Sequence, residues 1–390
     1  MKILFLSFYY KPDLCAGSFR SSALVKALQA IAPTAEIDII TTLPNRYSSF
    51  SQEAPEYEND GNISIHRIKL PSHKSGMLDQ SKAFLTYARK TLNVIKGNQY
   101  DLVYATSSRL MTAALGSWIA KKNKSPLYLD IRDIFVDTIK DVLPTHLSIL
   151  RYVFDTVEKL TIKQANKVNL VSKGFEDYFS SRYPNTKFSY YFNGVDDEFI
   201  DASSNENNTP PANNPISVLY AGNLGEGQGL HSILPSLANK LAGKVQFVIF
   251  GDGGRREALE SALEKEQISN VEIHPPVTRD QLIEEYKQAD ILFLHLNDYD
   301  AFKKVLPSKV FEYAALGKPI WAGVAGFAAK FINSEIENAQ VFEPCNSNQG
   351  LETFQQLKVE HTPRKDFIDK YKRSSIMKDM AKDILSITDC

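Results

Sequence analysis

Short apolar runs alternate with helical patterns through the first half of the chain. Residues 3–8 form a continuous apolar run, which is typical of a strand covered on both faces. Leu24, Ala27, Leu28 and Ile31 then recur at helical spacing. Further strands are predicted at 36–41, 63–68, 101–105, 126–131 and 167–171, and helices at 78–95 and 147–165. This order predicts a mostly parallel sheet with helices on its faces.

Residues 205–215 interrupt this alternation with a run rich in Asn and Pro, which can neither bury apolar surface nor continue a helix. The alternation then restarts. Strands are expected at 216–221, 245–250, 271–273, 290–296 and 319–322, and helices at 230–241, 255–266, 279–288, 307–316 and 327–332. Pro307 suits a first helical position, and Gly317 suits the residue just past a helix end.

The pattern therefore predicts an α/β protein with two doubly wound, Rossmann-like domains. We expect an N-terminal domain over 1–204, a linker over 205–215 and a C-terminal domain over 216–364. A charged helical tail over 365–390 can pack back on the N-terminal domain.

Composition narrows the class of protein. The 390 residues carry a net charge of −1, so no global basic field is present to bind nucleic acid. Three cysteines without a pairing pattern indicate a reducing compartment. The first apolar run lacks a small-residue cleavage site, and no stretch reaches the ~20 apolar residues of a membrane span. We expect a cytoplasmic protein, either soluble or attached to a membrane surface.

Ligands of doubly wound sheets bind at the carboxyl ends of the strands, so the loops that follow strands are candidate sites. The first such loop ends in Gly17, Ser18 and Arg20 and opens a helix. Glycine permits close approach to a ligand, the helix start offers N–H groups to an anion, and Arg20 adds a forked donor. A plain turn with Ser18 as the helix N-cap is the alternative.

Two glycine-rich loops follow strands of the second half. Residues 222–229 hold four glycines in eight positions, which suits backbone amides that cradle a diphosphate. Residues 251–257 deliver Arg255 and Arg256 to the start of a helix, where cations oppose the helix dipole. That placement indicates a nearby anion, unless Glu257 neutralises the arginines instead.

A fourth loop opens a helix with Ser308 and Lys309, and Glu312 lies one turn later on a similar face. A lysine can act as a point charge toward phosphate, and a carboxylate can accept both hydroxyls of a ribose. A surface pairing of Glu312 with Ser308 or Lys309 is the alternative.

In combination these loops resemble glycosyltransferase family 4, the retaining GT-B transferases, and most of all its subgroup in cell-surface polysaccharide and O-antigen synthesis. The resemblance spans nearly the whole chain and depends on the order and spacing of the motifs. They are Tyr9-Tyr10-Lys11-Pro12 with Gly17-Ser18-Phe19-Arg20, Asn193-Gly194-Val195-Asp196, Gly222-Asn223, Gly251-Asp252-Gly253, and Pro307-Ser308-Lys309 with Glu312.

The resemblance implies a GT-B fold whose two domains face a central cleft, and a site for a nucleotide-sugar donor. Donor contacts are implied for Gly17, Ser18, Asn193, Gly222, Asn223, Arg255, His274, Val277, Ser308, Lys309 and Glu312. Asp133 is the implied catalytic residue, with Arg132 as its helper, and Arg20 would contact the acceptor or a phosphate. For Asp133, a helix cap or a salt bridge with Arg132 is the alternative.

Two positions depart from the family pattern. Lys304 stands where many members carry a second Glu, and Gln228 stands where many carry a basic residue. The pair Asp298 and Asp300 follows a strand, as metal-binding pairs of other transferase folds do. In a GT-B site helix ends and basic residues meet the diphosphate, so we expect neither a metal nor a cofactor. His274 and His295 give no metal-binding pattern and are expected to be packed.

The sequence thus predicts a retaining transferase that moves a hexose or N-acetylhexosamine from a UDP-sugar to a glycan or polyprenyl-linked acceptor. A nucleotide-sugar 2-epimerase and a non-catalytic GT-B subunit of a synthesis complex are the alternatives. A lipid-linked acceptor would bring the first domain to a membrane, where cations of its predicted helices could face anionic lipid. These are Lys82, Arg89, Lys90, Lys96, Lys121, Lys122 and Lys124. An ordinary solvated helix surface explains them equally well.

Overall fold

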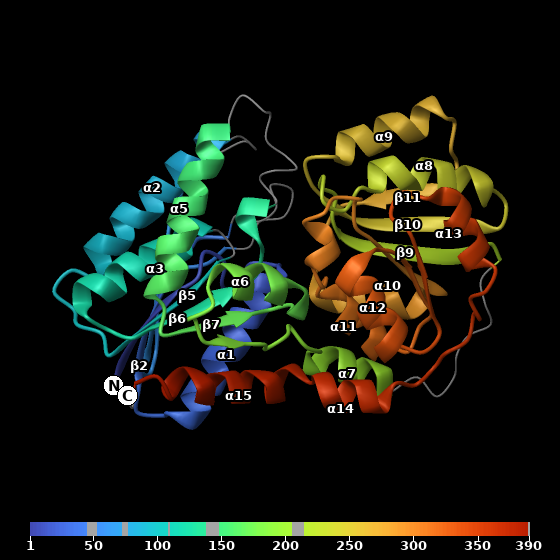
Figure 1. Cartoon of the computed structure of the whole chain (residues 1–390). Helices are drawn as coiled ribbons and strands as arrows, with labels where there is room; N and C mark the ends of the chain where they lie inside the picture. Colours follow the sequence, from blue (N-terminus) through green and yellow to red (C-terminus); the bar gives the residue numbers. More distant parts are fainter. Residues whose placement is uncertain (45–52, 72–76, 108–109, 138–147, 205–213, 389–390) are drawn as a thin grey trace. The chain divides into compact units, whose positions relative to one another are not determined.

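The computed structural model describes residues 1–44, 53–71, 77–107, 110–137, 148–204 and 214–388. The chain divides into two compact units (Figure 1). The N-terminal unit takes in the described residues of 1–193 and 374–388, and the C-terminal unit those of 194–373. Among the described residues, no helix is long and apolar enough to span a bilayer.

The N-terminal unit is built on an eight-stranded sheet of order β3-β4-β2-β1-β5-β6-β7-β8, parallel except for the β3–β4 hairpin. The strands are β1 (Lys2–Leu6), β2 (Glu36–Thr42), β3 (Tyr57–Asp60), β4 (Ile63–Ile68), β5 (Leu102–Thr106), β6 (Leu127–Ile131), β7 (Lys167–Leu170) and β8 (Phe188–Ser189). The helices are α1 (Ala16–Ile31), α2 (Met77–Val94), α3 (Leu110–Asn123), α5 (Ser148–Gln164), η2 (Lys173–Phe175), α6 (Glu176–Arg182) and α15 (Arg373–Leu385).

Helices cover both faces of this sheet. Figure 1 shows α2, α3 and α5 on one face and α1 with α15 on the other. Ile3 and Phe5 of β1 pack in the same core as Met377 and Met380 of α15. Leu6 points the other way, toward Gly116 of α3, because successive strand residues face opposite sides. Since α15 supplies part of this core, the C-terminal helix belongs to the N-terminal unit.

The C-terminal unit has a fully parallel six-stranded sheet of order β11-β10-β9-β12-β13-β14. Its strands are β9 (Ile216–Asn223), β10 (Val245–Asp252), β11 (Val271–His274), β12 (Ile291–His295), β13 (Ile320–Gly323) and β14 (Ala339–Phe342). Its helices are α7 (Asp197–Ser204), α8 (Leu230–Lys240), α9 (Arg256–Lys265), α10 (Arg279–Gln288), η3 (Phe302–Lys304), α11 (Lys309–Ala315), α12 (Gly326–Glu335), α13 (Ser347–Phe354) and α14 (Lys365–Tyr371). Phe247, Phe293 and Trp321 form the centre of its core.

The division between the units falls after Asn193, earlier than the expected linker over 205–215, most of which lies outside the described residues. Backbone bonds explain the position: the Val195 N–H donates to Tyr371 O at 2.7 Å, and the Arg373 N–H donates to Val195 O at 2.8 Å. Asp196 also pairs with Arg373, at 2.9 Å. These contacts fasten the segment that leads into α7 to the C-terminal unit.

Local differences from the expected elements have simple causes. The sequence analysis did not predict β3, although Gly61-Asn62 is a two-residue hairpin turn signal and Gly61 has a φ of +61°. The helix expected at 307 begins at Lys309, after Ser308 as its N-cap. Gly317 has a φ of +69° just past that helix, which confirms it as the terminating glycine.

Candidate functional site

In the C-terminal unit, a lysine ammonium lies against the glycine near the end of a central strand. Gly222 has a φ of +148°, and a Cβ atom built there would overlap the Nζ atom of Lys309. Lys309 Nζ also lies 6.0 Å from the ring centroid of Tyr220, whose hydroxyl donates to Asn223 O at 2.8 Å. Glycine at 222 therefore leaves room for a positive charge at the edge of the sheet where ligands bind in this class of fold.

The glycine-rich loop after β9 is held by side chains at both of its ends. Asn223 Nδ2 donates to Gln228 Oε1 at 2.7 Å. His295 is fully buried, with Nδ1 2.7 Å from Gln228 O, and its Nε2 accepts from the Cys345 N–H at 3.0 Å. A carbonyl oxygen only accepts, so the ring is neutral with its proton on Nδ1. His295 is thus packed, as the sequence predicted, and it fastens the loop to the sheet.

Stability should depend on pH through His295. Burial lowers its pKa to about 4, whereas an unfolded histidine titrates near ~6.5. Between those values the unfolded chain binds one proton more, so the free energy of unfolding should fall by about 3 kcal/mol as the pH drops through this window. Urea unfolding at both ends of the window, compared with His295→Gln, isolates this contribution. An identical pH dependence in the two proteins would contradict it.

Arg255 is paired with an acid that the sequence analysis did not consider. Its guanidinium meets Glu226 of the glycine-rich loop rather than Glu257. The Tyr299 hydroxyl also donates to Glu226, at 2.6 Å, and together with Arg255 it lowers the pKa of that carboxyl. The Asn297 amide donates to Glu226 O at 3.0 Å. The loop therefore carries its own anion opposite Arg255, which offsets that charge.

Glu312 lies beside an arginine that the sequence analysis missed. Burial lowers the pKa of Arg279, but the charges of Glu312, Asp196 and Glu198 outweigh burial and raise it above its usual range. Arg279 pairs with Asp196 and Glu198 and lies 4.8 Å from the ring centroid of Phe199. The sequence held a signal for Arg279. It is a cation at the first position of a helix, which is the same pattern that drew attention to Arg255 and Arg256.

The remaining expected residues of this unit lie at the same carboxyl edge. Ser308 makes no side-chain cap bond to α11. His274 lies at the end of β11, and its ring centroid is 4.9 Å from that of Phe250. Val277, three residues later, is half-buried. Lys303 pairs with both Asp298, at 3.6 Å, and Asp300, at 2.9 Å. Within the described part of the chain, no group of three or more His, Cys, Asp or Glu side chains is placed to hold a metal ion.

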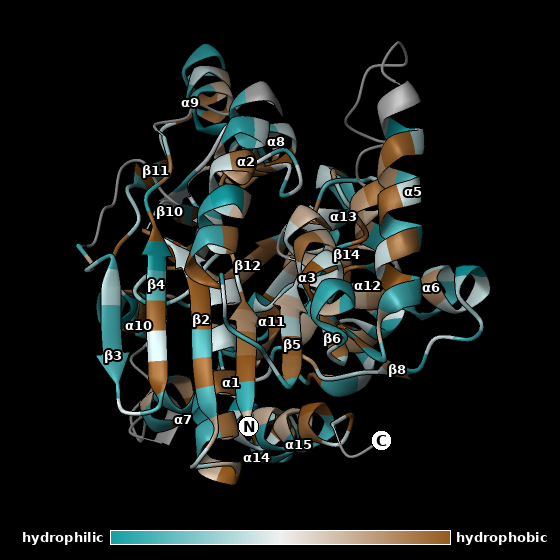
Figure 2. Ribbon diagram, turned by 90° about the vertical axis from the view of Figure 1, so that its left-hand side faces the viewer, coloured by the Kyte–Doolittle hydropathy of each residue, from teal (hydrophilic) through white to brown (hydrophobic). Residues whose placement is uncertain are grey.

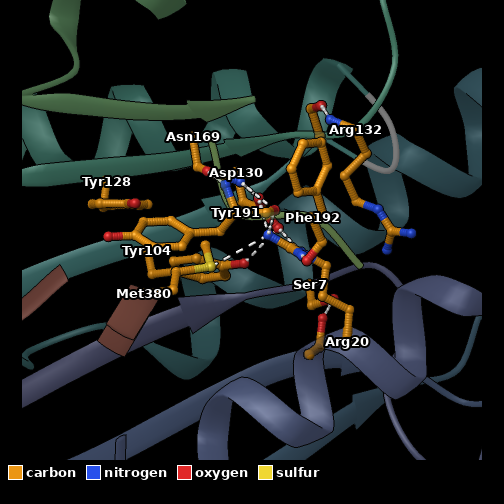
Figure 3. A network of polar contacts seen from close by, with 12 residues as sticks. Ser7, Arg20, Tyr104, Tyr128, Asp130, Arg132, Asn169, Tyr191, Phe192 and Met380 are labelled. Carbon is orange, nitrogen blue, oxygen red and sulfur yellow. Dashed lines mark hydrogen bonds and ion pairs between the residues drawn. The ribbon is translucent and has the colours of Figure 1, made fainter. Parts of the chain in front are cut away.

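In the N-terminal unit, a buried ion pair lies under the loops expected to be functional (Figure 3). Arg20 is 1% exposed and binds Asp130 through Nε at 2.7 Å and Nη2 at 2.9 Å. Tyr104 Oη and Asn169 Nδ2 donate to the same carboxylate at 3.0 and 2.7 Å. The other Arg20 donors bond to the backbone oxygens of Tyr191 and Phe192.

This network corrects the expectation for Arg20. Burial raises the pKa of Asp130, but the charge and hydrogen bonds of Arg20 outweigh burial and hold that pKa below its usual range. The guanidinium is therefore committed to a structural ion pair that joins α1, β6 and β7. It is not positioned to meet an acceptor or a phosphate, because it has almost no exposed surface.

Arg132 and Gly17 are brought together above this pair. A Cβ atom at Gly17 would lie 2.6 Å from Arg132 Nη1, so the absence of a side chain makes room for the guanidinium. The Arg132 N–H donates to Ser107 Oγ at 3.0 Å, and Asp133 is exposed next to it. Ser18 is buried in the first turn of α1, whose N-cap is Cys15 rather than Ser18, and Asn193 is buried at the end of the unit.

Comparison with known proteins agrees with this architecture. Residues 201–374 match the family described as glycosyl transferases group 1. A stretch of 163 residues is 29% identical to the Escherichia coli (strain K12) protein named "Putative colanic acid biosynthesis glycosyl transferase WcaI". That match covers 42% of this chain and 39% of the relative, so it spans well under half of either protein.

Solved structures share the fold over nearly the whole chain. An α,α-trehalose 6-phosphate synthase of Burkholderia multivorans has a TM-score of 0.69 at 14% identity and covers 99% of this chain and 96% of its own. HepE of Anabaena, in complex with UDP, scores 0.58 at 16% identity, with coverage of 100% and 98%. WaaG, a glycosyltransferase involved in lipopolysaccharide biosynthesis, scores 0.61 at 14% identity, with coverage of 99% and 97%. Residues 201–374 thus carry a glycosyl transferases group 1 domain, and the chain as a whole shares the GT-B fold of these solved structures.

Proposed function

We propose that this chain transfers a hexose or N-acetylhexosamine from a UDP-sugar to a glycan or lipid-linked acceptor in surface polysaccharide synthesis, as a family 4 enzyme with retention at the anomeric carbon. The names of WcaI and WaaG support the class of product, and the UDP in the HepE structure supports the donor. The reaction needs no cofactor, and we propose that it needs no metal.

One observation carries the proposal most directly: the Lys309 ammonium lies against Gly222 at the carboxyl edge of the group 1 domain. The nucleoside diphosphate gains negative charge as the bond to the sugar breaks. A fixed cation at that position stabilises the transition state more than the ground state. We assign the main charge on the diphosphate to Lys309, because its ammonium lies against Gly222, and a secondary one to Arg255, which also pairs with Glu226.

The roles of the remaining site residues are proposed from where each residue lies in its unit. We propose that Glu312 accepts the ribose hydroxyls and that the positive charge of Arg279 lies beside it. The segment from His274 to Val277 would contact the base, and the amides of Gly222 and Asn223 the phosphates. Asp133 with Arg132 would contact the sugar. Gly17 would keep Arg132 in place through the contact described above. Ser308 would contribute its side-chain hydroxyl. The side chains of Ser18 and Asn193 are buried, so we propose that these two residues contribute backbone groups to donor binding, Ser18 from the first turn of α1.

Product analysis tests the proposal. The purified chain, given a UDP-hexose or UDP-N-acetylhexosamine and a polyprenyl-phosphate-linked glycan, should yield UDP and an extended glycan whose new linkage keeps the donor's anomeric configuration by NMR. Conversion of the sugar in the absence of acceptor would identify an epimerase instead. Nucleotide binding without turnover on any acceptor would indicate a non-catalytic subunit.

A further inference from the structure

A cavity of about 380 Å³ opens on one flank of α1 in the N-terminal unit. Ile63 and Ile65 of β4 line its apolar side, and both side chains are buried. Asp60 of β3 pairs directly with Ile63 across the hairpin, so its side chain stands on the same face of the sheet. Figure 2 shows β3, largely in teal, at the edge of the sheet beside β4. The volume falls within the roughly 300–1,000 Å³ that is usual for small-molecule sites.

The cavity exists because the sheet extends past the helix that covers it. Leu24 and Leu28 of α1 pack in one core with Ile37 of β2, and the strand order continues outward from β2 to β4 and β3. On the same face, α15 lies over strands on the other side of β1, where Asp383 accepts from Tyr128 of β6 at 2.9 Å. The space between the outer flank of α1 and the β3–β4 hairpin therefore stays open.

This cavity lies apart from the candidate site of the same unit. Ile63 begins β4, and Gln29 lies in the last turn of α1, so both belong to the amino edge of the parallel sheet. Gly17 lies in the first turn of α1 and Arg132 follows β6, so both belong to the opposite, carboxyl edge. The cavity therefore extends along the flank of α1 away from Gly17.

Polar side chains of several kinds surround the apolar residues of the cavity. Ser22, Lys26 and Gln29 recur at helical spacing along the flank of α1. Lys11 comes from the loop after β1, and Asp60 comes from β3. The side chains of Lys11, Lys26, Gln29 and Asp60 make no hydrogen bond or ion pair with another described residue. These groups are therefore available to a ligand.

A buried arginine holds the walls of the cavity together. Arg67 of β4 is 4% exposed, and its Nη2 donates to Glu58 of β3 at 2.7 Å and to Lys11 O at 3.2 Å. These bonds tie the loop after β1 to the hairpin. Tyr10 of that loop is itself buried, and its hydroxyl lies beside the hydroxyl of Ser22. The cavity is therefore built from fixed elements and needs no rearrangement to accept a ligand.

The groups around the cavity fit a neutral sugar better than other small ligands. A phosphate or carboxylate would meet Asp60, and a cation would meet Lys11 and Lys26. An apolar ligand would desolvate these polar groups without replacing their hydrogen bonds to water. A sugar ring offers a C–H face to the isoleucines, and its hydroxyls both donate and accept, so they can pair with ammonium, amide and carboxylate groups alike.

We propose that this cavity is a sugar-binding site, separate from the donor site, which holds a mono- or disaccharide unit of a neutral glycan. One face of the sugar ring packs on Ile63 and Ile65, while Gln29 and Asp60 bond to its hydroxyls. Such a site raises the effective concentration of a glycan chain at the protein. It goes beyond the proposed transfer, and only the choice of a glycan as its natural occupant rests on the proposed function.

Saturation-transfer NMR on the full chain, without donor, tests the site. The probes are maltose, cellobiose, lactose and N,N′-diacetylchitobiose, and at least one of them should receive saturation from the unaltered chain. The variant Gln29→Ala/Asp60→Ala should bind that sugar at least about tenfold more weakly, because it removes an amide and a carboxylate that bond to hydroxyls. Its melting temperature should not fall, since neither side chain has a partner to lose. Ala23→Trp, which fills the cavity, should abolish the signal.

A matched variant on another surface serves as the control. Gln164→Ala/Asp177→Ala removes the same two side-chain types from exposed positions of α5 and α6, and it should bind like the unaltered chain. The proposal is refuted if no probe receives saturation, or if the Gln29/Asp60 variant binds as the control does. Displacement of the sugar by UDP would place it in the donor site, and displacement by inorganic phosphate would identify an anion site; either result also refutes the proposal. Sugar binding is measured without transfer, so a failure of the proposed reaction leaves this result unaffected.

Discussion

Replacing Lys309 with alanine is expected to lower kcat by about 10²–10³-fold, the usual cost of removing one donor that stabilises transition-state charge. The substitution removes the ammonium that lies against Gly222 and leaves the short side chain of Ala at a half-buried helix start. Because alanine favours helices, the melting temperature should change little. Steady-state kinetics with saturating acceptor measures the effect.

A matched lysine on the same unit provides the control. Lys330 is exposed on α12, and Lys330→Ala should keep the activity of the unaltered chain. Glu312→Ala should lower kcat/KM by at least about tenfold, because the donor ribose loses its acceptor. If the folded Lys309→Ala and Glu312→Ala variants transfer sugar at unchanged rates, the donor site does not lie at this edge of the sheet.

Replacing Asp130 with asparagine is expected to destabilise the N-terminal unit by about 3–5 kcal/mol, because it leaves the Arg20 guanidinium buried without its counter-charge. Asparagine keeps the size of the side chain, so the loss reports on charge rather than on a cavity. Native-state hydrogen exchange can localise it: amides of β5 and β6 should lose protection while those of β9 and β10 keep theirs. The second unit thus serves as an internal control.

The same pair can be replaced as a whole. In the double variant Arg20→Met/Asp130→Leu, no uncompensated charge remains in the core, so the protein should recover most of the stability that Asp130→Asn loses. A loss below about 1 kcal/mol in Asp130→Asn would show that water or a rearranged partner compensates Arg20, against the fully buried geometry of this network.

The sequence predicted the two parallel sheets because their strands are continuous apolar runs separated by helical spacing and by glycine or proline breaks. It also predicted which loops hold polar residues, since those loops follow buried strands. It did not predict the β3–β4 hairpin, because β3 is mostly polar and lies at an exposed edge. The place of α15 was also uncertain, because its contacts with β1 join residues more than 370 positions apart.

The sequence indicated the arrangement of candidate site residues that lie close together in the chain. Lys309 and Glu312 share a short helix, so their spacing indicated that they lie on a similar face. The contact of Lys309 with Gly222, near the end of β9, appears only in the fold. Pairings between distant residues were not predictable. The pair of Arg20 with Asp130 joins different elements, and so does the pair of Arg255 with Glu226. Only the fold therefore shows that Arg20 is structural and that Glu226 already neutralises Arg255.

The central claim is that the C-terminal unit binds a nucleoside diphosphate through Lys309, and a thermal-shift panel tests it most directly. The chain should be scanned with UDP, GDP, ADP, TDP and CMP, each with and without magnesium. A ligand at about 100 times its Kd adds roughly 2.7 kcal/mol to the stability of the folded state. The account predicts a clear shift with UDP that needs no magnesium and is lost in Lys309→Ala. The absence of a shift with every nucleotide, or an undiminished shift in Lys309→Ala, would contradict it.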